Sequence, residues 1–202
     1  MSTPTPRFRR SCWRNRHSAV PRGLRRRDLE AAPVSARVRI LGIDPGSQNT
    51  GFGVVDVDGL RTVAVRWGSI RTRGEHSARL RSIFSELGDI VRELEPAEIA
   101  IESVFLHRNA DSALKLGQAR AAALCATFHA DLPVFEYAPR HIKKAVVGSG
   151  GAEKTQVQRM VRMMLGLREE IEPDAADALA TALCHAHARL ARATLAKAAE
   201  AS

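Results

Sequence analysis

The sequence predicts a mixed α/β fold in which a five-stranded sheet is flanked by helices. Three runs of strand character, at residues 38–44, 52–58 and 62–70, follow one another closely enough to form an antiparallel meander. Two further short strands, 98–102 and 133–137, alternate with longer segments of helical character. A meander followed by alternating helices and strands is typical of a mixed sheet with helices on both faces.

Helical segments are predicted from apolar spacing and from residues that start or stop helices. Apolar residues recur at steps of three and four before Pro96, which marks the end of the first helix. Asp111 or Ser112 is expected to cap the second helix. The predicted helices span residues 75–94, 111–130, 139–147, 153–165 and 173–193.

Charge and length divide the chain into one domain, 37–193, and two tails. Residues 1–36 hold 9 Arg against Asp28 and Glu30, a net charge of +7, so the other 166 residues contribute only +2 of the total of +9. Such a basic arm can bind nucleic acid without sequence preference. The alternative is a disordered leader, with natural translation beginning near Val38 and intact mass as the test. Residues 194–202 are predicted to be a disordered tail.

Several classes of protein are excluded by composition. No apolar run approaches the roughly 20 residues that a membrane-spanning helix requires, and residues 1–36 contain no apolar signal-peptide core. Cys12, Cys125 and Cys184 are too far apart to indicate a disulfide framework or a zinc site, which favours a reducing cytoplasm. Cys125 and Cys184 are interpreted as small core residues, and His185 and His187 as a poor metal-binding pair.

Four acidic residues are candidates for chemistry. Asp44 and Glu102 end the first and fourth predicted strands, and the carboxyl ends of such strands often form ligand sites. Asp174 and Asp177 stand three residues apart on the last helix and therefore share a face. Each has a simpler interpretation, because Asp44 could start a turn, Glu102 could merely end a strand, and acids in a first helical turn complement the helix dipole.

Convergence of the four carboxylates would favour a metal-dependent nuclease. Without cations the charges would repel one another and raise their own pKa values. Carboxylate oxygens suit Mg²⁺ or Mn²⁺, and the sequence offers no cluster of Cys and His. Two such ions, roughly 3.5–4 Å apart, activate water and stabilise the leaving oxygen in phosphodiester hydrolysis.

Five segments, in order along residues 38–188, resemble the RuvC family of crossover junction endodeoxyribonucleases. They are LGIDPGS at 41–47, IESVF at 101–105, NADSALKLGQAR at 109–120, residues 138–154, and DAADALA at 174–180. The resemblance implies an RNase H-like fold and assigns metal binding and catalysis to the four acids. Some relatives have His where this chain has Asp174, and the leader has no counterpart in the family pattern.

The resemblance also implies an activity and partners. A homodimer would resolve four-way (Holliday) DNA junctions by paired symmetric nicks in strands of like polarity, leaving 5′-phosphate and 3′-hydroxyl ends. Mg²⁺ would be the cofactor, with two ions per subunit and Mn²⁺ able to substitute. The expected setting is homologous recombination and DNA repair in the cytoplasm, together with the RuvA–RuvB branch-migration complex.

DNA contacts are expected around the glycine joint at 148–151 and in the loop after Glu102. The resemblance predicts that Lys143 and Lys154 hold phosphates, with Lys154 also acting in catalysis, and that Phe105 stacks on or wedges between junction bases. A solvated basic face and a core phenylalanine are the simpler alternatives. The full set of expected DNA-binding residues is Phe105, Arg108, Arg140, Lys143, Lys144 and Lys154.

The Ala-rich helix at 113–126 contains an interior glycine, Gly117. Because an interior Gly costs a helix about 1 kcal/mol relative to Ala, close approach of another backbone would explain it. Packing on the chain's own sheet is one alternative, and the resemblance favours a dimer interface with twofold symmetry.

Three rival functions would share some of these sequence features. An actin-like ATPase or sugar-type kinase also opens with a strand, an Asp and a Gly-Ser turn, but it needs a second lobe that a chain of this length does not provide. A junction-binding protein without chemistry would be indifferent to Asp44→Asn. A related nuclease acting on RNA precursors would share the acids but not explain the match at 109–120.

Overall fold

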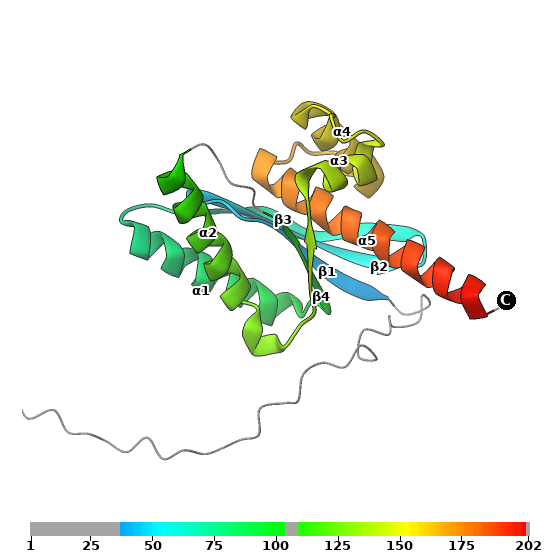
Figure 1. The fold of residues 1–202 in the computed structure, drawn as a ribbon, viewed down its shortest axis with the longest axis horizontal. Coiled ribbons are helices and arrows are strands. Elements are labelled where there is room, and N and C mark those ends of the chain that lie inside the picture. Colours follow the sequence, from blue (N-terminus) through cyan, green and yellow to red (C-terminus); the bar gives the residue numbers. More distant parts are fainter. Residues whose placement is uncertain (1–36, 104–108, 201–202) are drawn as a thin grey trace, which may run out of the picture. The chain divides into compact units, whose positions relative to one another are not determined.

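The structure, a computed structural model, describes residues 37–103 and 109–200 and contains a five-stranded mixed sheet (Figure 1). The strands lie in the order β3-β2-β1-β4-β5. The three strands of the meander pair antiparallel, as predicted, whereas β1–β4 and β4–β5 are parallel pairs, so the sheet is mixed. The strand bounds are β1 Val38–Asp44, β2 Asn49–Asp58, β3 Arg61–Arg71, β4 Glu98–Glu102 and β5 Val134–Tyr137.

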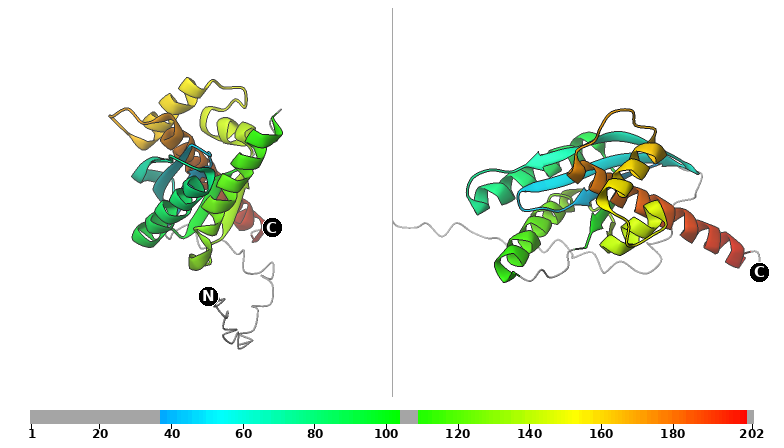
Figure 2. Two further views of the ribbon diagram at one scale, coloured as in Figure 1. Left: turned by 90° about the vertical axis from the view of Figure 1, so that its left-hand side faces the viewer. Right: turned by 90° about the horizontal axis from the view of Figure 1, so that it is seen from above.

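Helices cover both faces of the sheet, which confirms the predicted layering (Figures 1 and 2). One core cluster joins α1 and α2 to Leu41, Ile43, Ile99 and Ile101, and the other joins α3, α4 and α5 to the opposite face. Alternate residues of β1 therefore serve two cores, as the two-residue period of a strand requires. The helix bounds are α1 His76–Leu94, α2 Ala110–Cys125, α3 Pro139–Val147, α4 Lys154–Leu165 and α5 Pro173–Glu200, with a 3₁₀ turn, η2, at Phe128–Ala130.

Three predicted helix boundaries are wrong. Helix α2 is capped by the Asn109 side chain, not by Asp111 or Ser112, and it ends at Cys125, which is exposed rather than in the core. Helix α5 continues to Glu200, so residues 194–200 are helical instead of forming a disordered tail. The Ala-rich sequence of this segment explains the extension, because Ala has the highest helix propensity.

Glycines seat α5 directly on the sheet. A Cβ atom at Gly42 of β1 would lie 2.2 Å from the carbonyl oxygen of Ala178, and one at Gly53 of β2 would lie 2.8 Å from the Leu179 side chain. Gly42 and Gly53 are partners in the β1–β2 ladder. Because neither residue has a side chain, the backbone of α5 can approach β1 and β2 closely. Glycine in a strand often marks a place where another backbone comes close.

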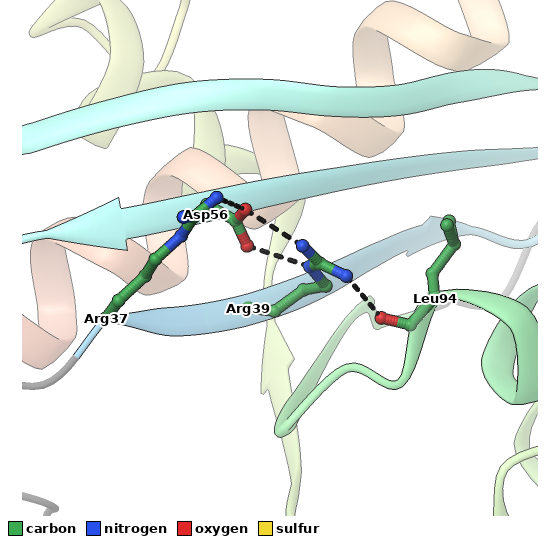
Figure 3. Close-up of polar contacts among 4 residues, drawn as sticks. All are labelled: Arg37, Arg39, Asp56 and Leu94. Atoms are coloured by element: carbon green, nitrogen blue, oxygen red, sulfur yellow. Dashed lines mark hydrogen bonds and ion pairs between the residues drawn. The ribbon is translucent and has the colours of Figure 1, made fainter.

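An ion-pair network around the buried Asp56 lies at the end of the sheet where β1 begins (Figure 3). Asp56 is 3% exposed and accepts hydrogen bonds from Arg37 and Arg39. The hydrogen bonds from Arg39, together with the charges of both arginines, outweigh burial and hold the pKa of Asp56 below its usual value. Arg39 also donates to the carbonyl oxygen of Leu94 at 2.8 Å, so the network ties β1 and β2 to the end of α1.

Within the described ranges, no helix combines the length and apolar character needed to cross a membrane. The basic leader at 1–36 lies outside the described residues, and its proposed absence from the native protein stays a prediction.

Candidate active site

Asp44 and Glu102 lie at one edge of the sheet because their strands are parallel neighbours. Ile43 of β1 pairs with Ile101 of β4, and each acid is the next and last residue of its strand. Both carboxylates therefore leave the sheet at the carboxyl ends of adjacent strands, where open α/β sheets often bind ligands.

The first turn of α5 lies at the same edge of the sheet, where it contacts Gly51 of β2. Gly51 is the partner of Asp44 in the β1–β2 ladder, and a Cβ at Gly51 would lie 2.0 Å from the carbonyl oxygen of Asp174. The start of α5 therefore rests on β2 beside Asp44. Asp177 follows one turn later on the same face of the helix.

The acids interact electrostatically. Burial, followed by the charges of Glu102, Asp177 and Asp174, raises the pKa of Asp44 to about 8, although Lys154 acts in the opposite direction. Burial and the charge of Asp177 likewise raise the pKa of Glu102 to about 7. Carboxylates respond in this way when several are drawn into one partly buried site without enough positive charge.

Lys154 supplies part of that positive charge. Its ammonium nitrogen lies 2.6 Å from Oδ2 of Asp177. Burial still raises the pKa of Asp177 despite this ion pair. For Lys154, burial alone would lower the pKa, but the hydrogen bond and charge of Asp177, helped by Asp44 and Asp174, hold it above the ordinary value.

A small pocket of about 130 Å³ opens between these acids and α3. Lys143 lies along it and donates to the carbonyl oxygen of Ala152 at 2.9 Å, which orients its ammonium group. The pocket thus combines two anions and two cations on an apolar floor. Its lining residues are Glu102, Pro139, Ile142, Lys143, Lys154, Val157, Asp177 and Ala180.

The structure separates the predicted DNA-binding residues into three groups. Lys143 and Lys154 line the pocket. Arg140 and Lys144 are exposed on α3 and do not line it. Phe105 and Arg108 lie outside the described residues, so their expected contacts with DNA stay predictions.

The loop after Asp44 is held by residues that the sequence analysis missed. The Thr50 hydroxyl donates to the carbonyl oxygen of Gly46 at 2.9 Å, and the Thr72 hydroxyl donates to that of Gln48 at 3.0 Å. A Cβ at Gly46 would lie 1.9 Å from the carbonyl oxygen of Asn49, so the turn is tight. Threonines in strands usually indicate β-propensity, which gives no signal of this second role.

Carboxylates are the candidate metal ligands of this site. In the part of the chain that the structure describes, no three His, Cys, Asp or Glu side chains are grouped closely enough to form a ready-made metal centre. The mutual effects on pKa show that Asp44, Glu102 and Asp177 are nonetheless near enough to interact. Oxygen donors with excess negative charge fit a hard divalent cation, whose charge would let the acids draw together.

Comparison with known proteins identifies the family. Residues 40–185 match the family model described as crossover junction endodeoxyribonuclease RuvC. The RuvC protein of Halorhodospira halophila is 56% identical over 160 residues, which cover 78% of this chain and 95% of that protein. The RuvC protein of Xanthomonas oryzae pv. oryzae is 53% identical over 154 residues, or 75% of this chain and 88% of that protein.

A solved structure leads to the same family. The structure of Thermus thermophilus RuvC in complex with a Holliday junction substrate superposes with a TM-score of 0.72 at 35% identity, covering 77% of this chain and 97% of that one. The fold is therefore RNase H-like, as the sequence motifs implied. On sequence and structure alike, the chain belongs to the RuvC family of crossover junction endodeoxyribonucleases.

Proposed function

We propose that this chain resolves four-way DNA junctions by metal-dependent hydrolysis of phosphodiester bonds, using the acids that meet at the carboxyl edge of the sheet. Family membership makes the chain a junction endonuclease, which leaves no support for a kinase or for a binding protein without chemistry. The observation that carries the mechanism is that Asp44 and Glu102 end adjacent parallel strands while the start of α5 contacts Gly51 beside them, since acids gathered in this way need a cation. The raised pKa values of Asp44 and Glu102 agree with this arrangement.

The residues that would hold the metal are Asp44, Glu102, Asp174 and Asp177. All four present oxygen donors, and their positions support the proposal: Asp44 ends β1, Glu102 ends β4, and Asp174 and Asp177 lie at the start of α5. We propose Mg²⁺ as the cofactor, two ions per subunit, with Mn²⁺ able to replace it. Bound divalent ions of this kind supply an activated water and stabilise the charge that develops on the leaving oxygen.

Lys154 and Lys143 would act on the phosphate. Lys154 pairs with Asp177, and Lys143 lines the same pocket. If Asp177 were to hold a metal ion, its carboxylate would be shared between that ion and Lys154, because both positive charges need the same oxygens. Lys154 would then be available to bind the scissile phosphate and the charge that forms on it in the transition state.

The proposed hydrolysis forms one bond to phosphorus and breaks another. The oxygen of a water molecule forms a new bond to phosphorus, and the bond from phosphorus to O3′ breaks. The water gives up a proton, and the departing O3′ takes one, so the products are a 5′-phosphate and a 3′-hydroxyl end. Nothing else is consumed, and these ends can be ligated.

A homodimer would present two such sites to two strands of like polarity, producing symmetric nicks. Gly117 of α2 supports this proposal, because a Cβ there would meet nothing within 4 Å among the described residues at 37–103 and 109–200. Packing on the sheet, all of which is described, therefore does not explain this glycine. Leu114, one turn earlier on the same helix, is 62% exposed and offers apolar surface to a second copy.

Further contacts follow from the same proposal. Arg140 and Lys144 extend the positive charge outward from the pocket along α3, where they would bind the phosphates of a junction arm. Phe105 and Arg108 are proposed to contact bases and backbone near the point of strand exchange. In the cytoplasm, the enzyme would act in recombination and repair, receiving junctions from the RuvA–RuvB branch-migration complex.

The test uses the full chain, a synthetic four-way junction and a linear duplex of the same sequence, with and without Mg²⁺. The expected result is a pair of opposed nicks in the junction, only with Mg²⁺, carrying 5′-phosphate ends. Asp44→Asn should retain junction binding and lose cutting, while Asp58→Asn, an exposed acid at the other end of β2, should behave as wild type. Cutting by Asp44→Asn at the wild-type rate would refute the assignment of the site.

A further inference from the structure

A buried polar network crosses from the sheet to α5 on the same face as the candidate site but does not belong to it. His185 of α5 is 0% exposed. Its Nδ1 lies 2.6 Å from the hydroxyl of Tyr137 on β5, and its Nε2 lies 2.6 Å from Oε2 of Glu98 on β4. Arg189, one turn further along α5, donates to the second oxygen of Glu98 at 3.1 Å.

Two hydrogen bonds fix the orientation of the histidine ring. A carboxylate can only accept, so Nε2 of His185 donates to Glu98. Nδ1 shares the second hydrogen bond with the Tyr137 hydroxyl, so both ring nitrogens have a partner. The ring also stacks on Phe135, with 4.3 Å between ring centroids and 29° between their planes. The two hydrogen bonds and the stacking on Phe135 together fix the position of the His185 ring.

The network joins the first residue of β4, the strand that ends in Glu102, to α5 two turns beyond Asp177. Four residues of strand separate Glu98 from Glu102, about 13 Å. Eight residues of helix separate His185 from Asp177, about 12 Å. The two lengths match, so a contact between Glu98 and His185 at one end places Glu102 opposite Asp177 at the other.

We propose that His185 is a positioning residue for the candidate active site: by joining α5 to β4 through Glu98, it sets the spacing between Asp177 and Glu102 and hence the affinity for the metal. A shift of α5 along β4 would change the distance between these two carboxylates directly. This inference rests on the proposed metal-dependent function. It assigns a role to a histidine that binds neither metal nor DNA.

Three variants test the proposal. His185→Phe keeps the stacking on Phe135 and removes both hydrogen bonds. His185→Gln places an amide nitrogen near the position of Nε2 and can still donate to Glu98. Tyr137→Phe removes only the hydroxyl and serves if His185→Phe does not fold. Ile83→Ala, in the core cluster on the opposite face of the sheet, is the control for a general loss of stability.

The first measurement is Mn²⁺ binding to the free protein by titration calorimetry, at a temperature well below unfolding. The second is the Mg²⁺ concentration that gives half-maximal cutting, and the third is junction affinity without metal. His185→Phe should weaken Mn²⁺ binding and raise the Mg²⁺ requirement on the order of tenfold, with junction affinity unchanged. His185→Gln should restore most of the loss, and Tyr137→Phe should show about threefold weakening.

Two results would overturn the inference. If His185→Phe and Tyr137→Phe bind Mn²⁺ as tightly as wild type, or lose no more than Ile83→Ala, the network only stabilises the fold. If the wild-type chain itself binds no Mn²⁺ and does not cut junctions, the proposed function fails first and the inference with it. These outcomes are distinguishable, because the first leaves wild-type activity intact.

Discussion

Gly51 of β2 lies directly beneath the main-chain carbonyl of Asp174, so close that a Cβ at Gly51 would stand 2.0 Å from its oxygen. Gly51 is also the ladder partner of Asp44. One residue without a side chain therefore brings the start of α5 to the tip of β1. The nearness of Asp174 to Asp44 depends on this contact.

Gly51→Ala should impair cutting far more than junction binding. The new methyl group must push the start of α5 away from β2, and a misplacement of about 1 Å in a catalytic group can cost about 100-fold in rate. Single-turnover cleavage and junction affinity would be measured side by side. Gly59→Ala is the control, because its φ of +57° makes Ala strained there, while no atom of the residues that the structure describes lies within 4 Å of the new Cβ. The control should lose about 1 kcal/mol of stability at unchanged rate.

Lys154→Ala should lower the rate of cutting by roughly 100-fold while junction affinity changes little, since its charge acts on the transition state. It should also move the pH–rate profile to higher pH. Lys154 lowers the pKa of both Asp44 and Glu102, so without it these acids lose their protons later. Lys144→Ala, on the exposed side of α3, should instead weaken binding and leave the rate of bound complexes unchanged. Equal losses in both variants would argue against a special role for Lys154.

The metal-free protein should become less stable as the pH rises from about 4 to about 8. The pKa of Asp44 is raised to about 8 from 3.8, so over this range the folded chain holds a proton that the unfolded chain has released. More protons on the folded state mean that stability falls with rising pH. Asp44→Asn, which cannot ionise, should melt several degrees higher than wild type near pH 8 and at the same temperature near pH 4. Melting curves in a chelator across this pH range test the claim, and a wild-type curve that does not fall would contradict it.

Asp56→Asn should destabilise the fold, because Asp56 is the buried partner of Arg37 and Arg39 (Figure 3). It should leave the chemistry unaffected, because Asp56 lies towards the opposite end of β2 from Gly51. Removing one partner of a buried ion pair should cost about 2–3 kcal/mol at pH 7. The folded pKa of Asp56 is lowered, so its contribution is present above the unfolded value of 3.8 and is lost as the pH falls through the folded pKa. Denaturant unfolding at pH 7 and below pH 3 should show the difference between variant and wild type shrinking in acid.

Leu114→Glu should convert a dimer to monomers. Leu114 is 62% exposed on the helix that carries Gly117, and a buried carboxylate in an apolar interface would be strongly unfavourable. Light scattering over a dilution series would report the mass. Leu60→Glu is the matched control, since Leu60 is 87% exposed in the turn between β2 and β3 and should leave the mass unchanged. A dimer that survives Leu114→Glu would place the interface elsewhere.

Residues near each other in sequence made most of the fold predictable. The meander of β1–β3, the strand ends at Asp44 and Glu102, and the helix that begins at Pro173 are all read from local periodicity and from proline and glycine. The same logic failed at the ends of α2 and α5. The side chain of Asn109 sets the start of α2, and a long Ala-rich stretch extends the end of α5. Neither feature changes the spacing of apolar residues from which the helix boundaries were predicted.

The sequence supplied candidate residues for the site but not its geometry. Motifs pointed to the four acids and to Lys143 and Lys154. They could not reveal that Lys154 pairs with Asp177, or that His185, dismissed as a poor metal ligand, joins Tyr137 to Glu98. Such contacts join residues far apart in the chain, and no local period marks them.

The sequence by itself determined the family, the order of strands and helices, and the kinds of side chain available for catalysis. Only the tertiary structure decided how closely α5 approaches the sheet, and therefore how strongly the acids raise one another's pKa values. The physical reason is that secondary structure follows from each residue's nearest neighbours. The electrostatics of a site depend instead on distances across the core, here set by glycines that let two backbones meet.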